Sequence, residues 1–411
     1  MKKTRSYILY ILLATTIIGC TTQKPANTVK VKTGAEVLIE KHLPELAGKR
    51  VGLFMNPTAR VGNTHVLDTL LALDTNITAL FAPEHGFRGD VGAGESIKSG
   101  IDSASGLPVH SLYSGGKILK PAPEVLQNLD IILFDMQDVG ARFYTYNVSM
   151  KRLLVAAADA GTEVWILDRP NPAGGDYVAG WVLEDQYRSA VGDYPIPVAH
   201  GLTLGELALM AIGEGWLETD NTVNLKIIEM EGWKRSYKWP ETGLPWFPPS
   251  PNLPHFDNAY AYLGTCFFEG TTLSEGRGTD NPFLIMGAPT TNINSDDLTL
   301  LGEKYGVKLD TVTFTPISMP GKAPNPKHKD AKSHGVQISS LSNNAKTLTD
   351  PVKFGVELMH LMMQATPDAE YREFLKKLAG TDQILTDTEP TSWGASYTDY
   401  VEKRTSYLIY K

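Results

Sequence analysis

The sequence predicts an α/β fold whose first large unit is a doubly wound parallel sheet. Five short apolar runs occur before residue 172, and amphipathic or alanine-rich stretches separate them. Continuous apolar strands that alternate with helices are typical of a parallel sheet covered on both faces. Right-handed crossovers then make the doubly wound arrangement the expected one. The runs are residues 50–55, 77–82, 108–112, 131–134 and 163–167, and the expected helices are 65–73, 123–129 and 150–160.

Residues 1–19 are predicted to be a lipoprotein signal peptide. Three cations, Lys2, Lys3 and Arg5, precede an apolar run at 8–18 that is too short for an ordinary transmembrane helix. The run ends at Gly19-Cys20, which resembles the lipobox of bacterial lipoproteins, with Cys20 as the lipidated residue. Residues 20–33 would then form a tether. The expected product is exported and lipid-anchored to a bacterial membrane, facing the periplasm or the cell surface. An ordinary signal peptide with a chance cysteine is the alternative.

The composition excludes several classes of protein. The apolar fraction of 42% and charged fraction of 20% are typical of globular proteins. The net charge of −8 becomes −11 without the three cations of the signal, which argues against a nucleic-acid partner. Cys266 is the only cysteine besides Cys20, so an intramolecular disulfide framework and a cysteine-rich zinc site are both excluded. We expect Cys266 to be buried and inert.

Polar turns follow all five apolar runs, at 56–58, 83–86, 113–116, 135–140 and 168–172. The carboxyl ends of parallel strands meet at one edge of a sheet, where ligands bind. Helix caps and strand breaks are the structural explanation for any single turn of this kind. Five such turns in register favour a site. The expected cleft contains Glu84, His85, Asp135, Asp138, Asp168 and Arg169.

The turn sequences exclude several kinds of chemistry. A dinucleotide site needs G-x-G-x-x-G after the first strand, and Asn56-Pro57-Thr58 stands there instead. P-loop, G-x-S-x-G and H-E-x-x-H motifs are also missing. A metal site of His85, Asp135, Asp138 and His200 lacks diagnostic spacing. A carboxylate pair remains, as in glycoside hydrolysis, where one acid with a raised pKa protonates the leaving oxygen. Glu84, between Phe81 and Phe87, suits that role.

The second half contributes two further segments. A helix is expected at 203–216, capped by Thr203 and Glu206, followed by a strand at 225–230. The proline-rich segment 233–256 carries six aromatic residues that either stack on sugars or cover a domain interface. After an expected aromatic strand, residues 266–283 combine glycines with charges and look like a ligand-binding loop. Those six aromatic residues are Trp233, Tyr237, Trp239, Trp246, Phe247 and Phe256, and the loop charges are Glu269, Glu275, Arg277 and Asp280.

The rest of the chain is expected to be α+β-like and to serve mainly as structural support. It would contain strands at 311–317 and 335–338, helices at 351–364 and 368–378, and a closing helix or strand at 397–411. His328 is the one residue there that we expect to reach the cleft.

Five motifs together resemble the bacterial exo-acting β-N-acetylmuramidases, formerly a domain of unknown function. The motifs are NPTA at 56–59, APEHGFRG at 82–89, DMQDVGARFYTY at 135–146, DRPNP at 168–172 and EGTTLSEGRGT at 269–279. The resemblance implies a peptidoglycan-recycling hydrolase that removes N-acetylmuramic acid from non-reducing glycan ends. It also implies a Rossmann-like domain at 34–260, a smaller α/β domain at 261–411 and a cleft between them, without a nucleotide or other cofactor.

We hypothesise that Glu84 is the general acid and that Asp138 or Glu269 is the second carboxylate. Arg142 or Arg277 would pair with the lactyl carboxylate, because guanidinium groups bind carboxylates in bidentate fashion. His85 and Asn171 would hold sugar hydroxyls. Two alternatives are a non-catalytic peptidoglycan-binding lipoprotein and a metal-dependent hydrolase or esterase. The remaining substrate-binding candidates are Asn56, Arg88, Asp135, Tyr144, Asp168, Arg169 and Glu275.

Overall fold

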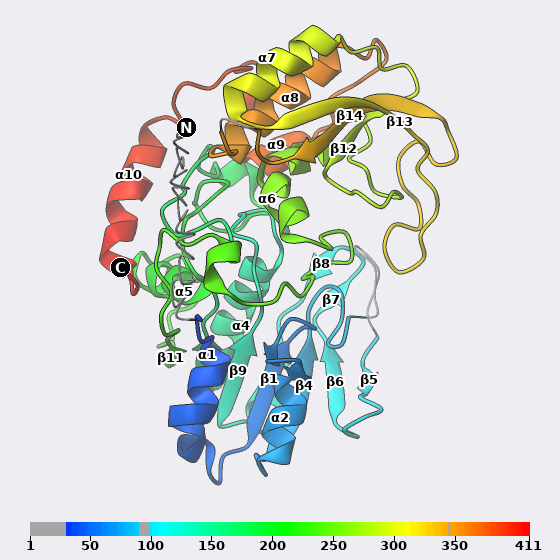
Figure 1. The fold of residues 1–411 in the computed structure, drawn as a ribbon. Coiled ribbons are helices and arrows are strands. Elements are labelled where there is room, and N and C mark those ends of the chain that lie inside the picture. The colour runs from blue at the N-terminus through cyan, green and yellow to red at the C-terminus, as the bar shows by residue number, and fades with distance from the viewer. Residues whose placement is uncertain (1–29, 90–97, 344–345) are drawn as a thin grey trace, which may run out of the picture.

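The computed structural model describes residues 30–89, 98–343 and 346–411 (Figure 1). Its largest sheet has seven strands in the order β11-β10-β9-β1-β4-β6-β5. Six strands run parallel and the short edge strand β5 runs antiparallel, which confirms the predicted parallel sheet. The strands are β1 Val51–Met55, β4 Ile77–Ala82, β5 Gly100–Ile101, β6 Pro108–Ser111, β9 Ile131–Asp135, β10 Glu163–Leu167 and β11 Leu225–Ile228.

The chain winds outward in both directions from the centre of this sheet. From β1 it passes to β4 and then to β6 on one side, and it returns to β9 on the other side before adding β10 and β11. The order therefore reverses between β1 and β9. The strand at Leu225–Ile228 extends the sheet beyond the five predicted strands.

Both faces of the sheet are covered, as the uniformly apolar strands require. In β1, Phe54 packs into a core with helices α4 and α5, whereas Leu53 and Met55 pack into a second core with helices α1 and α2. Successive side chains of a strand point to opposite faces, so one apolar run supplies both cores. The helices are α1 Gly34–Val37, α2 Val66–Ala72, α3 Pro123–Leu126, α4 Tyr146–Ala160 and α5 Leu204–Gly213.

The later part of the chain forms a smaller α/β layer beyond the carboxyl ends of the central strands (Figure 1). Its antiparallel sheet has the order β12-β14-β13, and helices α6 and α8 pack closely together. A Cβ on Gly264 of α6 would lie 2.0 Å from the carbonyl oxygen of Pro351 in α8, so only glycine allows this approach. The elements are α6 Phe256–Thr265, β12 Ile285–Ala288, α7 Ser295–Tyr305, β13 Lys308–Phe314, β14 Ser333–Ser340, α8 Pro351–Gln364 and α9 Phe374–Ala379.

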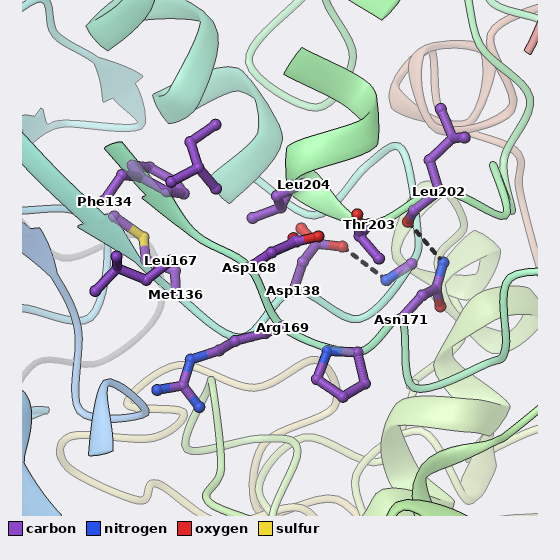
Figure 2. A pocket seen from close by; sticks show the side chains of 13 residues that line it. Phe134, Met136, Asp138, Leu167, Asp168, Arg169, Asn171, Leu202, Thr203 and Leu204 are labelled. Carbon is purple, nitrogen blue, oxygen red and sulfur yellow. Dashed lines mark hydrogen bonds between the residues drawn. The ribbon is translucent and has the colours of Figure 1, made fainter. Parts of the chain in front are cut away.

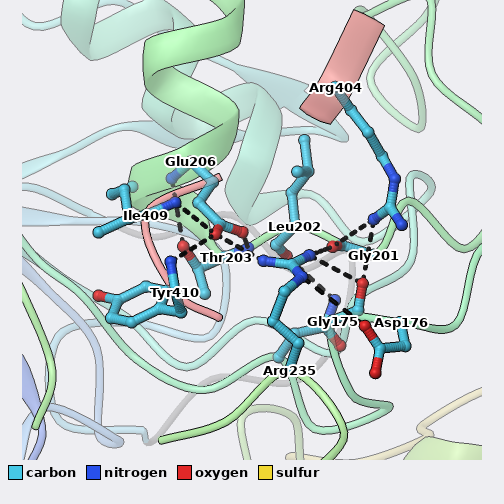
Figure 3. Close-up of polar contacts among 12 residues, drawn as sticks. Gly175, Asp176, Gly201, Leu202, Thr203, Glu206, Arg235, Arg404, Ile409 and Tyr410 are labelled. Carbon is cyan, nitrogen blue, oxygen red and sulfur yellow. Dashed lines mark hydrogen bonds and ion pairs between the residues drawn. The ribbon is translucent and has the colours of Figure 1, made fainter. Parts of the chain in front are cut away.

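The chain finally returns to the first sheet through helix α10, Ala395–Arg404. Figure 3 shows how the terminal residues are held: the Glu206 carboxylate accepts hydrogen bonds from Arg235 (2.6 Å) and from the backbone N–H of Ile409 (3.0 Å). Glu206 also completes the predicted capping box with Thr203 at the start of α5. The closing segment is thus helical, followed by a short tail whose Tyr410 is buried.

Three expectations differ from the structure. The expected aromatic strand before the charged loop is helix α6 followed by a 3-10 helix, Cys266–Gly270, because Phe256 and Tyr260 stack at helical spacing. The expected helix 368–378 begins only at Phe374, as α9, since Tyr371 forms a β-bridge with Thr271. At the end of the predicted tether, Val31 is buried and Lys32 bridges to Glu231.

The remaining N-terminal predictions, the signal peptide 1–19, lipidation at Cys20 and the tether up to residue 29, lie outside the described residues. Within the described part of the chain, no helix has the length and apolarity needed to cross a membrane.

Candidate active site

A cleft of about 820 Å³ lies between the strand-end loops of the central sheet and the smaller α/β layer. Glu84, His85 and Tyr144 line it from the first part of the chain, and Glu269 and Arg277 line it from the second. The structure therefore brings together candidate residues that are almost 200 positions apart. Other lining residues used below are Tyr113, Thr145, Glu275, Lys322, Lys327, Arg372 and Lys377.

Glu84 is positioned by the abrupt end of β4. The chain turns immediately afterwards, and His85 and Gly86 both have positive φ values, 71° and 83°. The Glu84 carboxylate accepts a hydrogen bond of 2.7 Å from the Thr145 hydroxyl, which stands at the N-terminus of α4. Burial and the neighbouring Glu84 carboxylate raise the pKa of the Tyr113 phenol. Two hydroxyl-bearing side chains therefore border the carboxylate on the cleft wall.

The opposing wall carries a second group of charges. Glu269, on the 3-10 helix, pairs with Arg277 at 2.6 Å, and Glu275 contacts Arg277 at 3.4 Å and Lys327 at 2.9 Å. Burial disfavours the charged guanidinium, yet the two glutamates raise the pKa of Arg277 above its usual value. The Glu269 side chain is 22% exposed and that of Glu275 only 4%, so Glu269 is the more accessible carboxylate.

The turn at 276–278 gives this loop its shape. Gly276 has a φ of 81°, and a Cβ there would lie 2.7 Å from the carbonyl oxygen of Ile285. The glycines that suggested a ligand-binding loop therefore serve to turn the chain sharply against β12.

Asp138 and Asp168 lie elsewhere, around an internal cavity of about 10 Å³, roughly the size of one water (Figure 2). Asp138 accepts a hydrogen bond of 2.7 Å from the Gly140 N–H, and Asp168 accepts from the Gly205 N–H (3.0 Å) and the Tyr410 hydroxyl (2.7 Å). Burial raises the pKa of each carboxyl to about 7. The predicted strand-end group is thus divided between the cleft and the protein interior.

His200 lies beside Asp138, with its Nε2 3.9 Å from Asp138 Oδ1, and burial lowers the pKa of this imidazole to about 3. Across the described ranges, no group of three or more His, Cys, Asp or Glu side chains is arranged to hold a metal ion.

Several other candidates are occupied by structural contacts outside the cleft. Asp135 forms a buried ion pair with Arg169, and Arg88 pairs with Asp68 (3.0 Å) and Asp102 (2.6 Å). These guanidinium groups hold neighbouring segments together.

Asn56, Arg142 and Asn171 have similar structural contacts. Arg142 is fully buried and donates to the carbonyl oxygens of Trp181, Ile196 and Leu378, each at 2.8 Å. Asn56 accepts from the backbone N–H of Thr58, and Asn171 donates to the carbonyl of Leu202. None of the three lines the cleft.

Among the later candidates, His328 is bonded to the Thr272 carbonyl oxygen at 2.9 Å and, like Asp280, does not line the cleft. The six aromatic residues of 233–256 do not line it either. Trp246 packs edge-on against both Trp239 and Phe256, which favours the interpretation of this segment as a cover.

Sequence reasoning missed several residues of the cleft. Thr145 stands inside the motif at 135–146, directly before a helix, and that position was a usable signal. Tyr113 belongs to one of the five strand-end turns but carries no charge. Lys322, Arg372 and Lys377 lie in segments without a recognisable pattern, because only the tertiary fold brings them to the cleft.

Comparison with known proteins agrees with this architecture. The N-terminal family model of the exo-β-N-acetylmuramidase NamZ matches residues 51–257, and the C-terminal model matches residues 260–410. The chain belongs to the NamZ family. This confirms the resemblance read from the five motifs.

A relative in the NamZ family is the peptidoglycan β-N-acetylmuramidase NamZ of Bacillus subtilis (strain 168). It is 39% identical over 403 residues, covering 94% of this chain and 92% of that protein. Two solved structures of DUF1343 family proteins from Bacteroides fragilis also match. The first is 37% identical with a TM-score of 0.74, and the match covers 93% of this chain and 99% of that structure's chain. The second is 33% identical with a TM-score of 0.78, and the match covers 93% of this chain and 100% of that structure's chain.

Proposed function

We propose that this protein is an exo-β-N-acetylmuramidase, a glycoside hydrolase that releases N-acetylmuramic acid from non-reducing ends of peptidoglycan fragments. Membership of the NamZ family supports the reaction class. The observation that carries the assignment is the cleft in which Glu84 shares one space with the Glu269–Arg277 pair. Such a cleft supplies the two carboxylates that glycoside hydrolysis requires.

Glu84 acts as the general acid in this proposal. Its carboxyl group stands on the cleft wall, where the Thr145 hydroxyl fixes its orientation through a bond of 2.7 Å. A fixed orientation allows the acid to deliver its proton to the glycosidic oxygen in the transition state.

Glu269 is the second carboxylate in this proposal, acting as nucleophile or base. Arg277 lies beside it as counter-ion and holds the carboxylate in place through a charge-assisted hydrogen bond of 2.6 Å. Asp138 is less suitable because it is 7% exposed and does not line the cleft.

The lactyl carboxylate of the substrate needs a cationic partner. Arg142 is excluded from direct contact by its burial and by its three carbonyl partners. Arg277 remains, and the exposed side chains of Lys322, Arg372 and Lys377 add positive charge to the cleft. An anionic sugar therefore suits a cleft in an otherwise acidic protein.

The test is hydrolysis of a disaccharide with muramic acid at its non-reducing end and N-acetylglucosamine at its reducing end. Glu84→Gln keeps the side-chain shape but cannot donate the proton, so kcat should fall by about 10²–10⁴-fold. Glu303→Gln, an exposed glutamate outside the cleft, is the matched control. Near-normal turnover by Glu84→Gln would remove Glu84 from the acid role. Loss of turnover on chelation would favour a metal-dependent hydrolase instead, and glycan binding without a released sugar would favour a non-catalytic binding protein.

Export and lipid anchoring at Cys20 belong to the same proposal. The cationic and apolar segments before Gly19-Cys20 support them. Metabolic labelling with a radioactive fatty acid should mark the wild type but not Cys20→Ser, and the variant should leave the membrane fraction. Equal labelling of the two proteins would contradict the anchor.

A further inference from the structure

A second cavity, of about 210 Å³, opens at the point where the strand order of the central sheet reverses. Thr58 follows β1 and Gln137 follows β9, and both line this cavity. In open α/β sheets, ligands bind in the crevice outside the carboxyl ends of the strands at such a reversal. The catalytic cleft instead lies beyond β4, and the two cavities share no lining residue.

One wall of this crevice is apolar and comes from the proline-rich segment. Trp239, Leu244, Pro245 and Phe247 line it. The Arg60 guanidinium lies 4.9 Å from the centre of the Phe247 ring, so the crevice combines an aromatic surface with a cation. Its volume is below the about 300–1,000 Å³ of sites for drug-sized ligands, which suits a ligand of one ring.

Gln137, shortly after β9, also lines the crevice. Gln137 is only 2% exposed, and its Nε2 donates to the carbonyl oxygens of Asp138 and Pro170, both at 2.8 Å. Those two acceptors fix the orientation of the amide. Gln137 Oε1 accepts no hydrogen bond from any residue that the structure describes. Because this oxygen also has almost no exposed surface, Gln137 serves as a fixed part of the crevice wall, and the ligand contacts are assigned to Phe247 and Arg60.

The charges of the crevice favour an anion. The Arg169 charge is offset by the buried Asp135 carboxylate, and Lys30 lies 3.7 Å from Glu36. Arg60 donates through Nε and Nη1 to backbone carbonyls and forms no ion pair with a described residue. One positive charge is therefore uncompensated beside the aromatic surface.

We propose that this crevice is a second binding site, for a single carboxylate-bearing sugar. The sugar ring packs against Phe247 and its carboxylate pairs with Arg60. The choice of N-acetylmuramic acid as the probe rests on the proposed function, whereas the site itself does not.

Titration of the full chain with N-acetylmuramic acid, followed through the indole N–H resonance of Trp239, tests the proposal. The resonance should shift on titration, and Phe247→Ala and Arg60→Gln should each weaken the apparent affinity at least tenfold. N-acetylglucosamine, which lacks the carboxylate, should bind at least tenfold more weakly to the wild type. Arg372→Gln, in the catalytic cleft, should leave the Trp239 response unchanged.

The same proteins are then assayed for disaccharide hydrolysis. Phe247→Ala and Arg60→Gln should keep wild-type kcat, which shows that they fold. An unshifted Trp239 resonance in the wild type overturns the second site, and so does wild-type affinity in both variants. If the Trp239 resonance of the wild type shifts but the protein does not hydrolyse the disaccharide, the second site is supported and the proposed function is rejected.

Discussion

Replacing Glu206 by glutamine is expected to destabilise the protein by about 3–5 kcal/mol, because it removes one partner of a buried ion pair. Glu206 is fully buried, and its carboxylate accepts from Arg235 at 2.6 Å, from the Ile409 N–H at 3.0 Å and from the Thr203 N–H at 3.0 Å. The variant keeps the side-chain volume, so the loss reports charge and hydrogen bonding. Such a loss is a large part of the about 5–15 kcal/mol by which folded proteins are stable.

The loss should be greatest at the C-terminal tail that Figure 3 shows beside Glu206. Urea denaturation measures the overall effect, and hydrogen exchange of the peptide containing Ile409 and Tyr410 measures the local one. We expect a lower urea midpoint and faster exchange in Glu206→Gln. The exposed-site variant Glu303→Gln, which makes the same chemical change, should match the wild type in both measurements. A destabilisation below about 1 kcal/mol with unchanged exchange would refute the reasoning, because an exposed ion pair contributes no more than that to stability.

Three further predictions concern separate parts of the molecule. Burial raises the pKa of Asp138 to about 7, so the folded state binds more protons than the unfolded state between pH 4 and 7 and loses stability as pH rises through that window. Asp138→Asn should therefore raise the Tm at pH 8 and change it little at pH 4; an equal effect at both would contradict the assignment. Gly264→Ala should cost about 1–3 kcal/mol by overpacking against the Pro351 carbonyl, measured by thermal unfolding beside Gly100→Ala, an exposed glycine without a positive φ and with no neighbour within 4 Å. Lys377→Gln should raise KM for the muramic acid disaccharide more than it lowers kcat, with a smaller effect at high salt; insensitivity of KM to the substitution would exclude Lys377 from substrate binding.

Much of the central sheet was predictable because its strands are buried on both faces. A run such as Ile131–Asp135 is then apolar at nearly every position, which leaves a clear signal in the sequence. The aromatic stretch after residue 256 gave the wrong prediction, because short apolar runs do not distinguish a buried helix from a strand. The pairing of Leu225–Ile228 with β10 depends on the tertiary fold, and the periodicity of the sequence does not predict it.

The site was predictable only in part for a related reason. Glu84 and Glu269 could be selected because each stands at an abrupt change from apolar to polar sequence, and both line the cleft. The sequence does not show in which direction a strand-end side chain points. Asp138 is turned inward by the bend at Gly140, whose φ of 78° is accompanied by close packing against Asn171. From the sequence, the Arg142 charge was expected to be available to the substrate. In the structure its guanidinium is bonded to buried carbonyls of residues 39 to 236 positions away.

Those carbonyl partners of Arg142 have a consequence for motion. Trp181 and Ile196 belong to the first part of the chain, whereas Leu378 lies on α9 beside Lys377 of the opposite cleft wall. Burial lowers the pKa of Arg142 to about 9, so the guanidinium still carries its charge at neutral pH and its bonds to the carbonyls are charge-assisted. Separating the walls would take the Leu378 carbonyl away from Nη2 of this buried charge, which opposes a hinge movement. In the proposed reaction the glycan end would therefore enter a preformed groove, and little of the binding free energy would be lost to closing the protein around it.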